Sequence, residues 1–314
     1  MPTHRDRDWI GRRIRVARHW SAGLVAVAAI TAPACGGPQD SGTARAPEAA
    51  PAALPDEFQP ANFGNSTMID NPWMPLTPGT RFVYEGTTIE DDGTALPHRV
   101  VINVTDLTKV IGGVRTVVTW DLDYSDGQLV EAELAFFAQD DAGTVWRVGE
   151  YPEEYEDGEF VAAPAWMHGF EDARAGITMM ADPQPGTPSY AQGWAPAVDW
   201  TDRGRVDQIA DSTCVPVDCY RGVLVIAETS ASEPDAEQLK FYARGVGEVR
   251  VGWQGAGEKT KETLELVEIV QLDAAALAEV RTSALALEQS AYQHSTNVYA
   301  HTPPLERAAA ASGQ

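Results

Sequence analysis

The chain has 314 residues, of which 46 are Asp or Glu and 23 are Lys or Arg, so its formal net charge is −23. This acid excess argues against a nucleic-acid-binding protein, which needs a basic surface to displace phosphate counterions. The composition, with 44% hydrophobic and 22% charged residues, is that of a globular protein. No apolar run approaches the roughly 20 residues of a membrane-spanning helix.

The first 34 residues have the pattern of a secretory signal peptide. Six arginines precede the apolar stretch 21–34, and small residues lead up to Cys35. A cysteine at this place resembles a bacterial lipobox, which implies cleavage before Cys35 and acylation of that residue. The protein would then be exported and held by its lipid on the outside of the cytoplasmic membrane or in the outer membrane. Ordinary cleavage after Ala34 without a lipid is the alternative.

Both ends of the exported chain lack the pattern of a folded core. Residues 35–60 are rich in Ala, Pro, Gly and Ser and show no apolar period, which predicts a disordered tether. Residues 293–314 also lack a pattern that could bury a core, and we expect a disordered tail there. The folded part is therefore expected to be a β domain over 61–272 with a helix over 273–292.

The first half of this body predicts antiparallel strands joined by tight turns. In 116–124, Val118, Trp120 and Leu122 share one face, and Asp121 and Asp123 share the other. Such alternation predicts a sheet that is covered on its apolar face and solvated on its polar face. Turn signals with the glycines that tight hairpins need recur between the alternating segments: Asp92-Gly93, Gly112-Gly113, Asp126-Gly127, Ala142-Gly143 and Asp157-Gly158.

The second half repeats this organisation. Segments 222–229, 238–243, 247–253 and 260–272 are expected to be strands. The aromatic hairpin pattern of 136–149 returns in 241–252, which is consistent with internal duplication. The alternative is that any two hairpins with an aromatic strand look alike.

Two further segments complete the predicted fold. Residues 161–200 are irregular and too apolar for a disordered linker, so we expect them to pack across an open end of the sheet or to form a lid. Asp273 can cap a helix to about Tyr292, whose apolar stripe is expected to pack on the sheet; a partner-binding helix is the alternative. The fold class is therefore mainly β: a curled antiparallel sheet, half-barrel or barrel-like, with one C-terminal helix.

No motif for a known chemistry is present. The sequence has no HExxH, P-loop, GxGxxG or GxSxG, and its histidines are not at zinc-ligand spacing. We therefore predict no catalytic residue, no metal ligand and no cofactor site. The densest acidic run, 150–159, could bind calcium or supply a carboxylate pair for acid–base chemistry, but a hairpin with a solvated acidic face is the interpretation that we favour.

The cysteines and tryptophans supply the candidate site residues. Cys214 and Cys219 are the only cysteines besides Cys35, and two nearby cysteines in an exported protein predict a disulfide. The tryptophans of the body form either a dense core or the lining of an apolar pocket. The candidate lining residues are Trp120, Trp146, Trp166, Trp194 and Trp200.

Residues 70–86 resemble the opening of a group of uncharacterised bacterial secreted proteins, which begin N-P-x-x-P-L-x-P-G-T and run into a strand ending in Y-x-G. The likeness extends to Phe137-Ala138-Gln139-Asp140, to 143–150 and to 241–247, and covers most of 64–270. It implies export and the fold. The group has no activity that could be transferred to this chain.

Two functions from different classes remain open at this point. The first is a non-enzymatic cell-envelope lipoprotein whose curved sheet holds an apolar small ligand or a partner protein, a pattern that loosely resembles lipoprotein carriers and lipocalin-like half-barrels. The second is a secreted hydrolase that uses carboxylates of 150–159 and of 161–200. A deep apolar cavity lined by tryptophan would favour the first function, and converging carboxylates with a raised pKa would favour the second.

Overall fold

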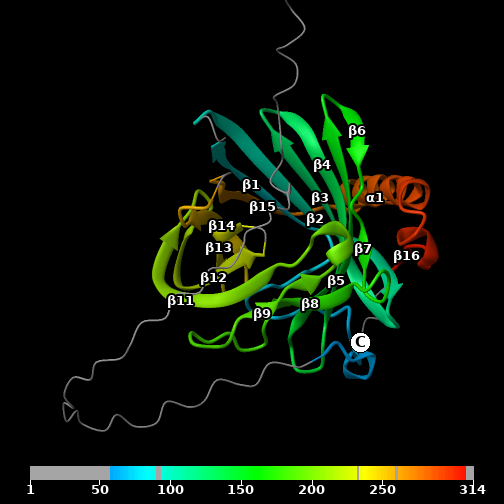
Figure 1. Ribbon diagram of the computed structural model, residues 1–314, viewed down its shortest axis with the longest axis horizontal. Coiled ribbons are helices and arrows are strands. Elements are labelled where there is room, and N and C mark those ends of the chain that lie inside the picture. The colour runs from blue at the N-terminus through cyan, green and yellow to red at the C-terminus, as the bar shows by residue number, and fades with distance from the viewer. Residues whose placement is uncertain (1–56, 90–92, 232, 259–260, 309–314) are drawn as a thin grey trace, which may run out of the picture.

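The computed structural model describes residues 57–89, 93–231, 233–258 and 261–308, so the signal peptide, Cys35 and most of the proposed tether lie outside the described residues. The predicted fold class is confirmed: one antiparallel sheet curls into a nearly closed barrel shape, and a single long helix follows it (Figure 1). No helix among the described residues is long and apolar enough to cross a membrane.

The sheet is built mostly from neighbours in the sequence. The strands are β1 Thr80–Ile89, β2 Ala95–Ile111, β3 Val114–Ser125, β4 Gln128–Gln139, β5 Val145–Glu156, β6 Glu159–Ala162, β7 Trp166–Met167, β8 Arg174–Met179, β9 Tyr190–Ala191, β10 Gly193–Trp194, β11 Arg203–Cys214, β12 Cys219–Ser230, β13 Glu233–Ala243, β14 Gly247–Gln254, β15 Thr263–Gln271 and β16 Glu306–Arg307. Their order is β10-β8-β5-β4-β3-β2-β1-β15-β14-β13-β12-β11-β9, while β6 and β7 pair with β5, and β16 pairs with β2.

The two ends of this strand order meet at a seam. β9 pairs with β11 and β10 pairs with β8, yet only Gln192 separates β9 from β10 in the chain. The irregular segment 161–200 therefore supplies the strands that bring the two edges of the sheet together, with the short 3-10 helix η2 Pro196–Val198 beyond them. Bringing the edges together leaves fewer backbone groups unpaired than an open sheet would.

The hairpin turns form where the sequence signals them. Asp126 and Gly127 both have positive φ, of 48° and 76°, as do Asp157 and Gly158, with 52° and 83°. Positive φ at both central residues is the backbone that matches the right-handed twist of paired strands. The predicted disulfide is also confirmed: Cys214 and Cys219 end β11 and begin β12, pair with each other across the two strands, and are joined.

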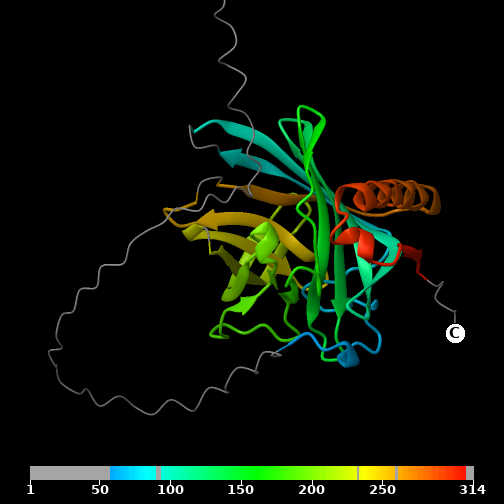
Figure 2. The same cartoon turned by 45° about the vertical axis from the view of Figure 1, so that its right-hand side comes forward.

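The helix α1 Ala274–His294 covers the outside of the sheet. Asp273 caps it by accepting hydrogen bonds from the backbone N–H groups of Ala275 and Ala276. Figures 1 and 2 both place α1 on the outer side of β2–β4, away from β11–β14. Of the predicted stripe, Val280, Ala284, Leu287 and Ala291 are buried.

The segment after the helix differs from the expected disordered tail. After α1 the chain forms the short 3-10 helix η3 Tyr299–His301, and β16 pairs with β2. Val298, Tyr299 and Leu305 of this segment are buried. The physical reason is a buried acceptor: Glu288 Oε1 of α1 receives a hydrogen bond from the Leu305 backbone at 2.8 Å and from the Tyr299 hydroxyl at 3.2 Å. These side chains are too widely spaced in the sequence to show a period.

Candidate functional site

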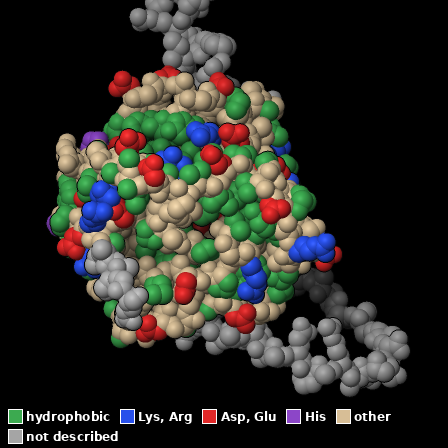
Figure 3. Space-filling view, turned by 180° about the vertical axis from the view of Figure 1, so that it is seen from behind, with side chains coloured by type: hydrophobic (Ala, Val, Ile, Leu, Met, Phe, Trp, Pro, Cys, Tyr) green, Lys and Arg blue, Asp and Glu red, His purple; other side chains and the backbone are tan. Residues whose placement is uncertain are grey.

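The sheet encloses a cavity of about 880 Å³. Among the described residues, its walls carry two basic side chains, Arg147 and Lys240, and twelve carboxylates. The carboxylates are Asp121, Asp123, Glu131, Glu133, Glu150, Glu154, Asp199, Asp202, Glu228, Glu248, Glu258 and Glu262. On the outer face that Figure 3 shows, by contrast, acidic side chains are scattered among basic, hydrophobic and other polar ones.

The strand register explains why the acids face inward. On neighbouring strands Asp123 lies opposite Glu131, which lies opposite Glu154, and Asp121 lies opposite Glu133. Residues opposite one another in a sheet share a face. The face of β3 and β4 that we expected to be solvated therefore lines the cavity, which corrects that expectation.

The apolar face of the same strands is on the outside, beneath the C-terminal residues. The Tyr299 ring lies 6.2 Å from that of Phe136 and 5.2 Å from that of Tyr151. Alternation shows that the two faces of a strand differ, but the curvature of the whole sheet decides which face is concave. Here α1 and the segment after it cover the convex face, so the acidic face encloses the cavity.

Burial changes the acidity of two carboxyls on opposite walls. Burial raises the pKa of Asp121 to about 7, and Glu150 adds to the rise, although Arg147 and a hydrogen bond from Thr119 oppose it. Its Oδ1 atom is buried and has no hydrogen-bond partner among the described residues. Burial likewise raises the pKa of Glu248 to about 7, against the opposing effect of Lys240. Both groups would exchange protons near neutral pH.

The two basic side chains of the cavity are engaged by its carboxylates. Arg147 Nη1 lies 2.5 Å from Glu150 Oε2, and the Arg147 guanidinium lies 5.4 Å from the ring of Trp200. Lys240 Nζ lies 3.3 Å from Glu228 and 3.8 Å from Glu248. The lining as a whole remains strongly negative.

A buried histidine joins two walls beside the cavity. His98 Nε2 lies 2.7 Å from Asp123 Oδ1, and Nδ1 lies 3.0 Å from Glu262 Oε1. Burial acts to lower the pKa of His98, but its hydrogen bond to Asp123 and its ion pair with Glu262 outweigh it and raise that pKa to about 10. His98 is therefore a cation at neutral pH and links β2 and β3 to the start of β15.

One end of the barrel is closed by residues 60–79, which we call the plug. Asn71 Nδ2 donates to the carbonyls of Gly143 and Met180, at 2.8 and 3.0 Å, and the Gly245 N–H donates to the Pro72 carbonyl at 2.7 Å. The plug is thereby bonded to the turns after β4 and after β13. The opposite end, where β1, β3 and β5 turn back, is called the rim.

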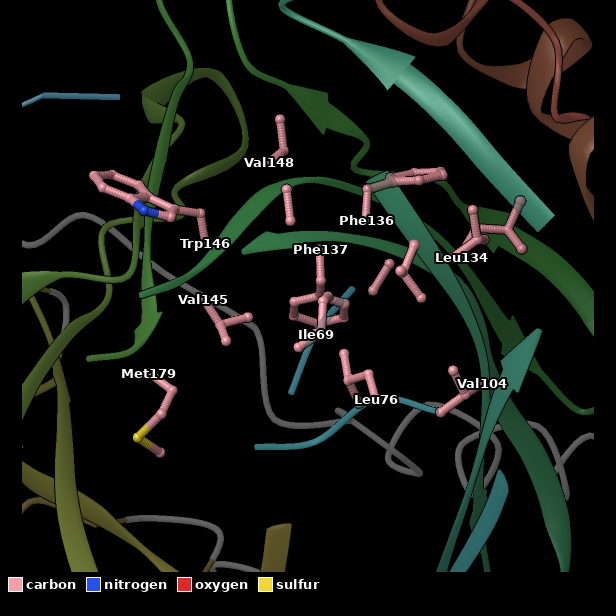
Figure 4. Packing of buried hydrophobic residues seen from close by; sticks show 14 of the residues in the cluster. Ile69, Leu76, Val104, Leu134, Phe136, Phe137, Val145, Trp146, Val148 and Met179 are labelled. Atoms are coloured by element: carbon pink, nitrogen blue, oxygen red, sulfur yellow. The ribbon is translucent and has the colours of Figure 1, made fainter. Parts of the chain in front are cut away.

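The plug also supplies the floor of the cavity. Met74, Pro75 and Leu76 line it, together with Val246 from the turn after β13. The plug is also part of the core, since Ile69 and Leu76 belong to the same buried cluster as Phe137 (Figure 4). Segments that resemble the group of secreted proteins thus meet here: the opening motif forms the floor, and Gly143 and Gly245, from two of the later segments, are bonded to it.

The two hairpins with similar sequences have matching structures. The register shifts between Phe136 and Phe137 in the β4–β5 pair, and between Phe241 and Tyr242 in the β13–β14 pair. These are equivalent positions of the repeated pattern, and each hairpin turn contacts the plug. A bulge bends a strand and increases its twist, so both hairpins curve the sheet around the cavity.

Of the five candidate tryptophans, only Trp200 lines the cavity. Trp200 lines the cavity and stacks on the buried Trp166, with ring centroids 6.1 Å apart. Trp146 is buried in the core, where its Nε1 donates to Asp140 at 2.9 Å. Trp120 lies on the outer face of β3, and Trp194 is 45% exposed.

Sequence reasoning missed the residues that dominate the lining, namely the inward carboxylates, and it also missed Trp253 near the rim. The acidic run 150–159 divides between the two faces of β5. Glu150 and Glu154 line the cavity, whereas Glu153 faces outward and accepts hydrogen bonds from Tyr151 and Tyr155.

Within the described ranges, no group of three or more His, Cys, Asp or Glu is placed to hold a metal ion.

The comparisons with known proteins show only remote similarity. No protein-family model and no curated protein matches the chain. One similar solved structure is a protein classed as exported, with a YmcC-like fold, from Bacteroides fragilis; it is 13% identical, with a TM-score of 0.39, over 63% of this chain and 98% of that one. Another is a protein classed as a lipoprotein from Parabacteroides distasonis, 14% identical, with a TM-score of 0.29, over 66% of this chain and 100% of that one.

Proposed function

We propose that this protein is a lipid-anchored protein of the cell envelope that binds a small organic ligand inside its barrel-shaped sheet, without catalysing a reaction. The observation that carries the proposal is the cavity of about 880 Å³, a volume within the range of roughly 300–1,000 Å³ that is typical of small-molecule sites. Its floor is apolar and its walls are polar, as a site for an amphipathic molecule requires.

The floor and the walls come from different parts of the chain. Met74, Leu76 and Phe82 offer an apolar surface at the plug. Nearer the rim, Trp253 lines the cavity together with carboxylates such as Glu258 and Glu262. A ligand would place its apolar part against the plug and its polar part among the carboxylates.

Native mass spectrometry of the full-length protein from its own host tests the ligand. We expect a copurified small molecule, which Val246→Trp should expel because the larger side chain fills the floor of the cavity. Val217→Trp is the matched control, since Val217 is 38% exposed in the β11–β12 turn and does not line the cavity. Equal occupancy of the two variants would contradict the proposal.

The signal sequence supports export and anchoring. Cys35 follows an arginine-rich region, an apolar stretch and small residues. Replacing Cys35 with Ser should prevent acylation and release the protein into the soluble fraction. A Cys35→Ser variant that stays in the membrane fraction, together with a wild type that incorporates no palmitate label, would contradict the anchoring.

A secreted hydrolase is the second candidate, and one observation favours it. Asp121, whose pKa is raised to about 7, lies on the wall that also carries Glu150, which is paired with Arg147. One protonated and one ionised carboxyl form the pair that glycoside hydrolysis uses. Hydrolysis of a panel of nitrophenyl glycosides that is lost in Asp121→Asn would establish this function. The spread of the carboxylates over all the walls is more in keeping with binding.

A further inference from the structure

We propose that residues 190–202, which we call the strap, form a lateral gate: the strap separates from β8, moves with β11, and so admits the ligand to the cavity through the side of the barrel. This inference rests on the proposed function, because it assigns an entry route to the molecule held in the same cavity. The strap contains β9, β10 and η2 and lies between β11 and β8 (Figure 1).

The strap is a hairpin that continues into β11. Its two arms are bonded to each other: the Gln192 N–H donates to the Asp202 carbonyl at 2.9 Å, and Ala195 and Trp200 exchange backbone hydrogen bonds of 2.7 and 3.1 Å. The Gln192 side chain also donates to Glu228 of β12 at 2.5 Å. These contacts are all on the β11 side of the seam, so they persist when the strap leaves β8.

The ladder that joins the strap to β8 is short. Among the described residues, β10 pairs with β8 through two residue pairs, Gly193 with Ala175 and Trp194 with Arg174. The ladder between β3 and β4, by contrast, runs through most of both strands. Segments with few backbone hydrogen bonds and few buried apolar contacts open locally at a low free-energy cost. The seam is therefore a place where the wall can open while the rest of the sheet stays paired.

Side-chain packing at the seam is separate from the main core. Trp166, Ala173 and Ala195 form a small buried cluster of their own, and Trp200 of the strap packs against it. The buried Trp166 Nε1 has no hydrogen-bond partner among the described residues, and an unpaired buried donor reduces the stability of the packing around it. Opening the seam disrupts this small cluster and leaves the main core intact.

The strap is also a wall of the cavity, which Ala197, Val198 and Trp200 line from this side. Movement of the strap away from β8 therefore exposes the interior. The closed position depends on a close approach of the two backbones: a Cβ atom at Gly176 of β8 would lie 2.1 Å from the backbone nitrogen of Gly193. Glycine at 176 thus allows the strap to close.

A reversible lock across the seam tests the gate. Arg174→Cys and Trp194→Cys place two cysteines at opposite, exposed positions of the β8–β10 ladder, within reach of a disulfide. Both are introduced into the full-length chain with Cys35→Ser, so that no lipid on the chain can take up a probe. Stopped-flow fluorescence follows binding and release of the neutral probe N-phenyl-1-naphthylamine. Oxidation should slow both at least about tenfold relative to the reduced form and leave the dissociation constant within about twofold.

The matched control is a second lock within the sheet. Glu85 and Arg99 are exposed, lie opposite each other on β1 and β2, and do not line the cavity. Oxidation of a Glu85→Cys, Arg99→Cys variant should leave both rates unchanged. If the rates are also unchanged in the oxidised seam variant, the probe enters by another route and the inference is overturned.

Gly176→Ala should have the opposite effect, because the added Cβ meets the backbone of the strap and holds it away from β8. We expect release of the probe to be at least about threefold faster, with faster amide hydrogen exchange over 190–202. Gly252→Ala is the control, since its Cβ would make an ordinary contact of 3.9 Å with the Phe241 ring. Release at the wild-type rate from Gly176→Ala would overturn the inference.

Val246→Trp separates this inference from the proposed function. If it abolishes binding of N-phenyl-1-naphthylamine, but the oxidised seam lock does not change the rates, the cavity is the site and the gate is wrong. If Val246→Trp leaves binding of the probe unchanged, the probe binds elsewhere and both proposals fail.

Discussion

Lys109 Nζ lies 3.2 Å from Glu288 Oε1, beneath helix α1 on the convex face of the sheet. The lysine is fully buried, and its Nζ also donates to the Pro303 carbonyl at 2.6 Å and lies 4.0 Å from the centre of the Tyr299 ring. Burial lowers the pKa of Lys109 to about 8, although Glu288 acts to raise it. This pair joins β2, the helix and the segment after it.

Lys109→Met should destabilise the protein strongly, because it leaves Glu288 buried without its cation. Removing one partner of a buried pair typically costs about 3–5 kcal/mol. Lys109→Met combined with Glu288→Gln should recover part of this loss, since no uncompensated charge remains. Urea unfolding of the two variants and the wild type measures the effect. Equal stability of the single variant and the wild type would show that the pair is dispensable.

Tyr299→Ala should also destabilise the protein, by about 3–5 kcal/mol, as expected for removing a large buried aromatic side chain. Tyr299 is fully buried against Phe136, Tyr151 and Tyr292. Tyr299→Phe keeps the ring and removes only the hydrogen bond to Glu288, so it should cost about 1–2 kcal/mol. If thermal unfolding places both variants at the wild-type Tm, the segment after α1 is not part of the core.

Short-range patterns in the sequence predict the strands, turns and helix of this fold. They do not predict features that depend on contacts between residues distant in the sequence. Asp126-Gly127 fixes its turn through its own backbone, and Asp273 caps its helix through its own side chain. The concave side of β3 depends instead on the curvature of the whole sheet and on what covers the other side. For that reason the alternation in 116–124 predicts the strand, but it does not predict that Asp121 and Asp123 face the cavity and not the solvent.

The candidate site was predictable only in part for the same reason. Trp200 was a candidate because of its residue type, but Trp146 and Trp166 are of the same type and lie in the core. The floor depends on Asn71, whose partners Gly143 and Met180 are distant in sequence. Nothing in the local pattern around Asn71 indicates that it bridges them.

Asp121 should make stability depend on pH. Its pKa rises from 3.8 to about 7 on folding, mainly through burial. The folded state therefore holds this proton more tightly than the unfolded chain does, so ionising Asp121 lowers the stability as the pH rises from about 4 to about 7. Asp121→Asn should raise the Tm by several degrees at pH 8 and leave it unchanged at pH 3. An equal Tm difference at pH 3 and pH 8 would contradict this assignment. So would a similar rise in Tm at pH 8 in Asp211→Asn, which changes an exposed carboxyl of β11.

The disulfide between Cys214 and Cys219 should contribute only modestly to stability. It closes a short loop, with a sequence separation of 5, and the entropy that a cross-link removes from the unfolded chain grows with loop length. Replacing both cysteines with Ser should therefore cost about 2 kcal/mol in urea unfolding. Titration of the denatured, unreduced protein should find neither thiol free. A loss much larger than this would mean that the β11–β12 turn also needs the bond to reach its folded conformation.

Asn71→Ala should loosen the plug and weaken ligand binding together. The Asn71 side chain donates to Gly143 and Met180 and accepts from the Trp73 backbone N–H at 2.8 Å. The substitution leaves two buried carbonyls and one N–H without these partners, at a cost of about 1–3 kcal/mol for each group that is not satisfied otherwise. Because Met74 and Leu76 follow directly and form the floor of the cavity, we expect a lower Tm and faster amide hydrogen exchange over 70–76. Asn65→Ala, at an exposed position in the same segment, is the control. Loss of the copurified ligand without faster amide hydrogen exchange over 70–76 would mean that Asn71 contacts the ligand directly and does not act through the plug.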